Sequence, residues 1–295
     1  AAEFAHVFSA LGVEVTQANR SARLLRGVDE EVVARFEEAA SKQWNIVKDA
    51  SLSEIRENAD GSVTVVAKRT TENGEELLEI PADAVLVATG RRPNTDTLNA
   101  KNYFDVQDGG QLSVDKYQRV LYNGAPVPGV YALGDVSSRY QLKHVANHEA
   151  RVVQHNLSHP EDLRASDHRY VPAAVFSNPQ IAVVGMTEEQ ARQAAEREGF
   201  EITVKAQNFG DTAYGWAMED KIGLCKLIAR KDNGVLLGAH LVGEESSVLI
   251  QPLLQAMSFG MDARTLARGQ YWIHPALTEI IENALLGLEF DEPAN

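Results

Sequence analysis

Residues 270–288 read QYWIHPALTEIIENALLGL, a C-terminal stretch that joins an amphipathic helix pattern to a histidine and an acid. Proline is well tolerated at the first helical position, so the pattern predicts a helix that starts at Pro275. His274 then stands just outside this helix, and Glu279 lies about one turn in. One apolar stripe follows at helical spacing, formed by Ile280, Ile281, Ala284 and Leu285. The stretch therefore predicts a helix that packs against a core.

His274 and Glu279 are the candidate catalytic residues of this stretch. On a continuous helix, five residues would turn the two side chains about 140° apart. Because the chain turns at Pro275, and X-Pro bonds can be cis at modest cost, the imidazole can instead fold back toward the carboxylate. A carboxylate that orients a histidine ring and fixes its tautomer makes a general acid–base pair. The alternative is a surface helix on which the two side chains never meet.

Length and charge limit the possible functions. The 295 residues suffice for two or three domains, each with its own core. No run approaches the ~18 apolar residues of a membrane span, and no signal-peptide pattern opens the chain, so no membrane partner is expected. The net charge of −14 argues against nucleic acid as a partner, because phosphates require a basic surface.

Cys225 is the single cysteine of the chain. The sequence therefore has no internal disulfide and no thiolate metal cage, which is typical of a reducing, cytoplasmic setting. Because Cys225 lies in the apolar run IGLCKLIA, we expect a small buried thiol and not a nucleophile.

Four histidines recur at helical spacing in the middle of the chain: His144, His148, His155 and His159. Imidazoles at i and i+4 can share a metal ion. The HExxH pattern is not completed, however, and Pro160 indicates that the helix frays before His159. A half-exposed polar helix is the better interpretation, and no metal site is predicted.

The first part of the chain has a helix–strand–helix–strand order, which favours an α/β doubly wound domain. Helix patterns cover the opening AAEFAHVFSALG and residues 29–42, and short strands are expected after Gly12 and at 45–49. Residues 84–88 are a continuous apolar run, which predicts a buried parallel strand. Two further strands, 62–68 and 76–80, flank an Asn73-Gly74 turn signal and predict a hairpin.

Arginines follow the expected strand near residue 16. In a dinucleotide-binding βαβ unit, an acid at the end of the second strand selects NAD, whereas a nearby arginine accommodates the 2′-phosphate of NADP. Here the strand ends without an acid, and the loop carries Arg20, Arg23 and Arg26. This loop favours NADPH, and the alternative is a solvated basic loop.

The middle of the chain contains residues 129–135, GVYALGD, which predict a parallel strand ending in Gly134-Asp135. Ligands bind outside the carboxyl ends of such strands, where glycine permits close approach and a carboxylate can accept hydroxyl hydrogen bonds. The alternative is an ordinary turn, which Gly-Asp also marks. A helix is expected at about 145–156.

The last part of the chain follows a polar linker and has strand patterns broken by few helices. The strands are expected at 173–176, 181–185, 201–208, 223–229 and 234–242, and the helices at 187–198, 246–259 and the C-terminal stretch. This order predicts an α+β domain built on an antiparallel sheet.

Five stretches in this order resemble the flavin-dependent pyridine nucleotide–disulfide oxidoreductases, the group of glutathione reductase and dihydrolipoamide dehydrogenase. They are AAEFAHVFSALGVEVT, VLVATGRRPN, GVYALGDV, AVFSNPQIAVVGMTEEQA with LLGAHLVG, and HPALTE. Five ordered matches across the chain are far more specific than any one of them. Residues 270–288 are most similar to the mycothione reductase subfamily, whereas glutathione reductases typically read HPTSSEE there.

The resemblance implies a domain order and a set of partners. Residues 1–91 would be part of an NADPH-binding domain, 92–168 the returning half of an FAD-binding domain, and 169–295 an interface domain that forms a homodimer. The implied fold is α/β, with partial doubly wound nucleotide-binding domains followed by an α+β dimerisation domain with an antiparallel sheet. FAD and NADPH are the implied cofactors, and a small-molecule disulfide is the implied substrate.

The resemblance also implies roles for particular residues. Gly134 and Asp135 match the second FAD motif, with Asp135 on the ribityl chain. The nicotinamide side would be lined by the crossover residues Gly90, Arg91 and Arg92. His274 and Glu279 match the acid–base pair that each subunit lends to its partner. The helix start that points at the flavin's pyrimidine edge would consist of Lys143, His144 and Val145.

The family pattern also includes parts that this sequence does not contain. These are the redox-active Cys-x4-Cys pair and the Gly-rich loops for FAD and NADPH. We therefore expect the chain by itself to show no turnover and weak or no FAD retention, while the interface domain dimerises. One alternative is a dihydrolipoamide dehydrogenase that uses NAD, and another is a non-enzymatic dimerisation fragment.

Overall fold

The computed structural model describes residues 1–71 and 74–291, which form two compact units. One unit combines residues 1–88 with the chain from Pro172 onward, and the other contains residues 89–171. The mixed α/β architecture, with an antiparallel sheet in the last part of the chain, confirms the predicted fold class. The division into three domains stays a prediction. Asn73 of the predicted turn lies outside the described residues.

The first segment begins with α1 (Ala2–Ala10), β1 (Thr16–Ala18), α2 (Glu30–Ala40) and β2 (Asn45–Val47). β1 and β2 pair in parallel. The side chain of Asp29 caps α2 by accepting a hydrogen bond from the N–H of Glu31. Phe36 of α2 is fully buried and shares a core with Leu224 and Val242, so this helix packs on the C-terminal sheet.

A three-stranded antiparallel sheet follows, in the order β3 (Ala50–Glu57), β4 (Val63–Thr71) and β5 (Gly74–Ala82). It confirms the predicted pair of strands and adds β3. The predicted buried strand at 84–88 is wrong, because these residues are exposed and form no strand. A parallel strand needs neighbours for its N–H and C=O groups, and no described strand pairs with this run.

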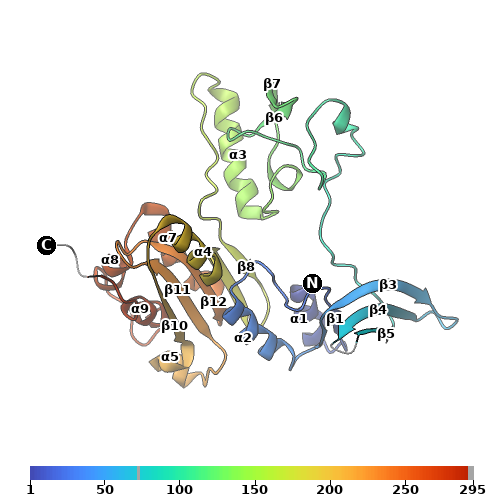
Figure 1. The fold of residues 1–295 in the computed structure, drawn as a ribbon, viewed down its shortest axis with the longest axis horizontal. Coiled ribbons are helices and arrows are strands. Elements are labelled where there is room, and N and C mark those ends of the chain that lie inside the picture. Colours follow the sequence, from blue (N-terminus) through green and yellow to red (C-terminus); the bar gives the residue numbers. More distant parts are fainter. Residues whose placement is uncertain (72–73, 292–295) are drawn as a thin grey trace. The chain divides into compact units, whose positions relative to one another are not determined.

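The C-terminal sheet has the order β10-β11-β12-β9-β8, with every neighbouring pair antiparallel (Figure 1). All five strands lie where the sequence predicts them. Their bounds are β8 Ala173–Val175, β9 Gln180–Gly185, β10 Ile202–Asn208, β11 Leu224–Arg230 and β12 Leu236–Gly243. Cys225 is fully buried in β11, as its apolar surroundings predict.

Helices surround this sheet: α4 (Glu188–Glu198), α5 (Ala213–Ala217), α6 (Ser246–Leu249), α7 (Gln251–Phe259), α8 (Ala263–Arg268) and α9 (Glu279–Leu286), with a short 3₁₀ turn, η3 (Phe209–Asp211). A capping box between Thr187 and Gln190 starts α4. The single helix predicted at 246–259 is divided into α6 and α7. Pro252 lies at the start of α7 and has no N–H to continue the hydrogen-bond ladder.

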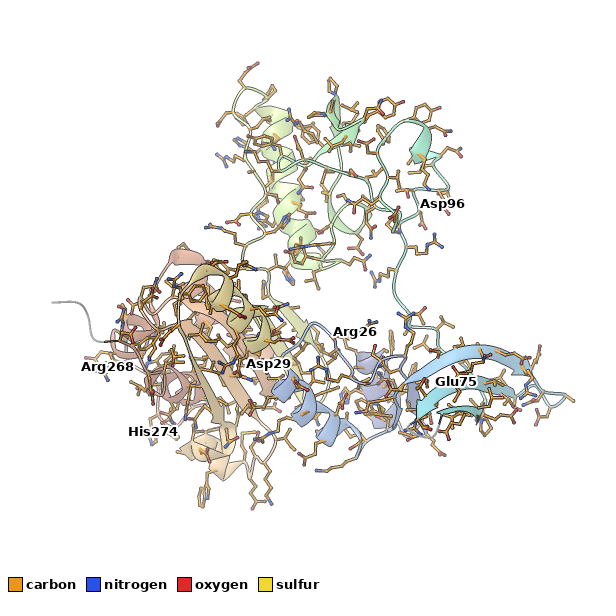
Figure 2. All side chains as sticks on the ribbon, viewed as in Figure 1. Arg26, Asp29, Glu75, Asp96, Arg268 and His274 are labelled. Atoms are coloured by element: carbon orange, nitrogen blue, oxygen red, sulfur yellow. The ribbon has the colours of Figure 1, made fainter. Side chains whose placement is uncertain are left out.

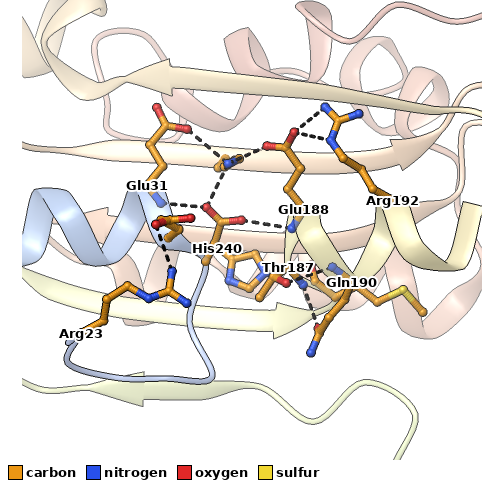
Figure 3. A network of polar contacts seen from close by, with 11 residues as sticks. Arg23, Glu31, Thr187, Glu188, Gln190, Arg192 and His240 are labelled. Carbon is orange, nitrogen blue, oxygen red and sulfur yellow. Dashed lines mark hydrogen bonds and ion pairs between the residues drawn. The ribbon is translucent and has the colours of Figure 1, made fainter. Parts of the chain in front are cut away.

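A buried ion-pair network joins the first segment to this sheet (Figure 3). Nζ of Lys226 in β11 lies 2.9 Å from Asp29, 3.2 Å from Glu31 and 2.7 Å from Glu188. The second carboxylate oxygen of Asp29 accepts a hydrogen bond from the N–H of Glu188 at 3.1 Å. Asp29 therefore contacts the N-terminal ends of both α2 and α4.

The unit of residues 89–171 contains η1 (Ala100–Asn102), β6 (Arg119–Tyr122), β7 (Ala125–Tyr131), η2 (Gly134–Val136) and α3 (Lys143–Ser158). The strand predicted to run to Asp135 ends at Tyr131, and it pairs antiparallel with β6 and not in a parallel sheet. Gly134 and Asp135 instead begin the 3₁₀ turn η2, in which Gly134 has a φ of +70° that favours glycine.

Candidate active site and cofactor-binding residues

His274 and Glu279 form a hydrogen-bonded pair, with Nδ1 of His274 2.7 Å from Oε1 of Glu279. The peptide bond between His274 and Pro275 is cis. The helix begins at Glu279 and not at Pro275, so its predicted start is wrong. The N–H groups of Glu279 and Ile280 bond to carbonyls three residues back, which is the pattern of a turn and not of an α-helix. The turn brings the two side chains together.

The pair is open on one side and enclosed on the other. The side chain of His274, which is labelled in Figure 2, is 67% exposed, whereas that of Glu279 is 16% exposed. Glu279 also accepts a hydrogen bond from the N–H of Ala276 at 3.4 Å. Within the described residues, Nε2 of His274 has no hydrogen-bond partner. A ring held at Nδ1 and open at Nε2 can pass a proton to a group from outside this chain.

The Gly134–Asp135 turn of the second unit has the features of a ligand-binding turn. A Cβ at Gly134 would lie 3.3 Å from Cβ of Ala146, so the turn packs tightly on α3. The Asp135 carboxylate is 47% exposed and lies 3.1 Å from Nη1 of Arg91. Oγ of Ser137 is buried and has no partner among the described residues. Asp135 therefore offers an accessible acceptor for a ligand rich in hydroxyl groups, and the unpaired Ser137 hydroxyl lies two residues further along the chain.

The predicted helix start lies at the first residues of α3. Leu142 precedes the helix, and its side chain accepts no hydrogen bond from the first N–H groups of α3. Lys143 donates a hydrogen bond to Asn147, and Val145 is buried. His144 is exposed. This helix start suits a group that carries negative charge.

The loop after β1 holds the predicted phosphate-binding arginines. Asn19 shapes this loop by donating hydrogen bonds to the carbonyls of Ser21 and Arg23. Arg20 and Arg26 are exposed and have no ion-pair partner within the described residues, whereas Arg23 lies 3.4 Å from Glu30. Two guanidinium groups therefore remain available for a phosphate.

The crossover residues Gly90 and Arg92 lie in an exposed segment without helix or strand. Gly90 has a φ of +121°, which a residue with a side chain rarely adopts. The structure brings Arg91 to Asp135 and His274 to Glu279. It places the arginines of residues 20–26 in the other compact unit from Asp135.

Two buried polar groups were not found from the sequence. Glu149 is 1% exposed and lies 2.9 Å from Nε2 of His168, and Lys226 is also buried. Glu149 occupies the apolar stripe of its helix between Val145 and Val152, and Lys226 interrupts an apolar strand. A charged residue at a position where the pattern otherwise has apolar residues is the signal that could have identified Glu149 and Lys226.

Neither membrane-spanning helices nor clustered metal ligands occur in the part of the chain that the structure describes. Across residues 1–71 and 74–291, every helix is too short or too polar to cross a bilayer. The same residues include no group of three or more His, Cys, Asp or Glu side chains placed to hold a metal ion. His155, one of the regularly spaced histidines, lies 2.8 Å from the carbonyl oxygen of Asp162.

Residues 1–150 match the pyridine nucleotide-disulphide oxidoreductase family, and residues 171–285 match the dimerisation domain of that family. The chain belongs to the pyridine nucleotide-disulphide oxidoreductases. This membership confirms the resemblance carried by the five ordered stretches.

Members of this family are similar to the chain over almost all of its length. Mycothione reductase of Mycobacterium tuberculosis is 53% identical over 293 residues, which are 98% of this chain and 60% of that protein. Dihydrolipoyl dehydrogenase of Synechocystis is 32% identical over 96% of this chain and 59% of its own length. The HOCl-induced flavoprotein disulfide reductase RclA of Escherichia coli superimposes with a TM-score of 0.81 at 26% identity, covering 96% of this chain and 61% of that structure. The chain thus spans about 60% of the length of these oxidoreductases.

Proposed function

We propose that this chain is part of an NADPH-dependent flavoprotein disulfide reductase that reduces mycothione, the disulfide of mycothiol. The observation that carries the proposal is the hydrogen bond of 2.7 Å between His274 and Glu279, which leaves the other ring nitrogen open. The identity of 53% to mycothione reductase supports the choice of substrate.

In this proposal His274 is the general acid and base. Reduction of a disulfide releases two sulfur groups that must be protonated or kept as thiolates. His274 holds a proton at Nε2 and delivers it to the leaving thiolate, while Glu279 fixes the orientation and tautomer of the ring. Bound FAD would supply the electron transfer between NADPH and the disulfide.

The proposed cofactor contacts use groups from each unit, of which the Asp135 carboxylate is exposed and the Ser137 hydroxyl is buried. Asp135 and the hydroxyl of Ser137 would receive the hydroxyl-rich part of FAD, and the start of α3 would face the flavin ring. Arg20 and Arg26 would bind the 2′-phosphate of NADPH. An NAD-dependent dihydrolipoamide dehydrogenase is less favoured, because an acid would be expected where Asn19 and Arg20 stand.

A homodimer completes the proposal, since the imidazole would act in the partner's active site. Tyr271 is fully exposed and Ile273 is 74% exposed, so apolar groups flank His274 on an open surface. Apolar side chains of this kind are typical of the centre of a subunit interface. Light scattering on the chain tests this part, and a strictly monomeric result would count against it. A cytoplasmic location remains a proposal that rests on the single cysteine.

The activity test uses the full-length protein with NADPH and mycothione, compared with NADH and lipoamide. We expect turnover with the first pair and little with the second, and the reverse preference would identify the dehydrogenase alternative. The 295-residue chain should give no turnover, because Cys225 is its single cysteine and is buried. Disulfide-dependent NADPH oxidation by this chain would refute that expectation.

A further inference from the structure

Glu149 is an acid enclosed in the core of the second unit. It lies in the middle of α3, its residue is 1% exposed, and the other buried residues of this helix are Val145, Val152, Val153 and Asn156. A buried carboxyl group is costly unless its oxygens are hydrogen-bonded. The partners of Glu149 therefore indicate why an acid occupies this position.

Each carboxylate oxygen of Glu149 has one partner. Oε2 accepts a hydrogen bond from the backbone N–H of Gly134 at 2.6 Å, and Oε1 lies 2.9 Å from Nε2 of His168. Nε2 of His168 also lies 3.4 Å from Oγ of Ser166. The backbone carbonyl of His168 accepts a hydrogen bond from the hydroxyl of Tyr140 at 3.2 Å. The acid thus links the linker segment around His168 to the Gly134 turn.

The Gly134 turn also packs on Ala146 of α3, and its Val136 carbonyl accepts a hydrogen bond from the N–H of Leu112 at 2.9 Å. The Gly134 carbonyl accepts hydrogen bonds from the N–H groups of Ser137 and Ser138, which close the turn on itself. The hydrogen bond from the Gly134 N–H to Glu149 adds a polar contact between the turn and α3. Asp135 follows directly, and its carboxylate remains accessible. A displacement of Gly134 would therefore move Asp135 as well.

We propose that Glu149 is a positioning residue that fixes the Gly134–Asp135 turn through the Gly134 N–H, with His168 as its second partner. The inference rests on the proposed function to the extent that this turn binds FAD. Glu149 acts in this proposal through the backbone of the turn. It determines where the Asp135 carboxylate stands and which way the Gly134 backbone faces.

Three variants test the inference. Glu149→Leu removes the acceptor, Glu149→Gln keeps an acceptor oxygen without the charge, and Arg151→Leu is a control at an exposed position of the same helix. Amide hydrogen exchange at Gly134, measured by NMR on the chain, reads the contact directly. In Glu149→Leu the exchange should become roughly tenfold faster or more, because a hydrogen bond to a charged group is lost. Glu149→Gln should recover most of the protection, and Arg151→Leu should leave it unchanged.

The FAD dissociation constant of the full-length protein is the second readout. We expect it to rise roughly tenfold in Glu149→Leu and to be restored largely by Glu149→Gln. Unchanged exchange at Gly134 in a folded Glu149→Leu variant would overturn the positioning role. Faster exchange with unchanged FAD affinity would show that Glu149 holds the turn, but it would overturn the assignment of this turn to FAD binding. Failure of the unmodified full-length protein to bind FAD would overturn the proposed function itself.

Discussion

Nζ of Lys226 lies 2.9 Å from Oδ1 of Asp29, so a strand near the C-terminal part of the chain is tied to the cap of a helix near its start. Both side chains are less than a tenth exposed. Glu188 completes the network from α4 and is held in turn by Arg192 (Figure 3). A charge pair that is removed from water in this way depends strongly on both partners being present.

Replacement of Lys226 by methionine should destabilise the unit that contains it. Loss of one partner leaves the buried Asp29 carboxylate unpaired, and the expected cost is about 3–5 kcal/mol of unfolding free energy. Urea denaturation followed by circular dichroism measures the change. Because asparagine also caps helices well, the double variant Asp29→Asn/Lys226→Met should recover part of the loss.

The matched control for Lys226 is Lys231→Met, because Lys231 makes its ion pairs with Glu201 and Asp291 at the surface. Surface pairs contribute little, so this variant should unfold close to the unmodified chain. Equal destabilisation by the two lysine variants would show that the buried network contributes no more to the unfolding free energy than a surface ion pair does.

The network also predicts a dependence of stability on acid pH. Burial alone would raise the pKa of Asp29, but Lys226 and the N–H of Glu188 bind its charged form, so the pKa of Asp29 is lowered. Burial likewise opposes ionisation of Glu188, but Lys226 and Arg192 lower the pKa of Glu188. Acids with lowered pKa values stabilise the fold above about pH 4 and lose that contribution as pH falls through the folded-state values.

The measurement compares the unmodified chain with Lys226→Met at several pH values. The difference in urea midpoint should be full at neutral pH and should shrink below about pH 4, as the carboxylates become protonated. Burial works against the ammonium, yet its carboxylate partners raise the pKa of Lys226, so no loss is expected from this group near neutral pH. A midpoint difference that stays constant into acid would contradict this account.

His274→Ala should lower turnover of the full-length protein roughly 10²- to 10⁴-fold, the range for loss of a general acid–base group. Glu279→Gln should have a smaller effect, because the ring remains but loses its charged partner. Reduction of the flavin by NADPH, followed by absorbance after rapid mixing, should be unchanged in both variants. Glu282→Gln on the same helix is the control, and normal disulfide turnover by His274→Ala would exclude the proposed role.

The arginine loop can be tested by cofactor preference. Arg20→Ala/Arg26→Ala should raise KM for NADPH roughly 10- to 100-fold in the full-length protein, because hydrogen bonds between charged groups are lost. KM for NADH should change little, since NADH lacks the 2′-phosphate. Arg197→Ala, on the exposed end of α4, is the control. An equal rise of KM for NADPH and for NADH would mean that the arginines do not bind the 2′-phosphate.

Local patterns in the sequence predicted much of the fold. The strands of the C-terminal sheet alternate or are continuously apolar, and α4 carries Thr187 and Gln190 at its start, so each element has its own signal. The contact between His274 and Glu279 was also open to prediction, because both residues flank one turn. Interactions within a few residues leave their mark in the local sequence.

Features that depend on distant residues were missed or misassigned. Residues 84–88 have the composition of a buried strand, but burial requires neighbouring strands. β3 was not found because seven of its eight residues are exposed, which removes the alternation that marks a strand. Lys226 and Asp29 stand 197 positions apart, and no local pattern predicts that they meet.

The burial of Cys225 has a practical consequence for work on this molecule. Burial raises the pKa of the Cys225 thiol to about 12, so almost none of it is thiolate at neutral pH while the chain is folded. Thiol reagents should therefore leave the folded chain unlabelled. A cysteine introduced at an exposed position away from His274, such as Leu98, would carry a fluorophore or spin label at one defined point without removal of the native residue.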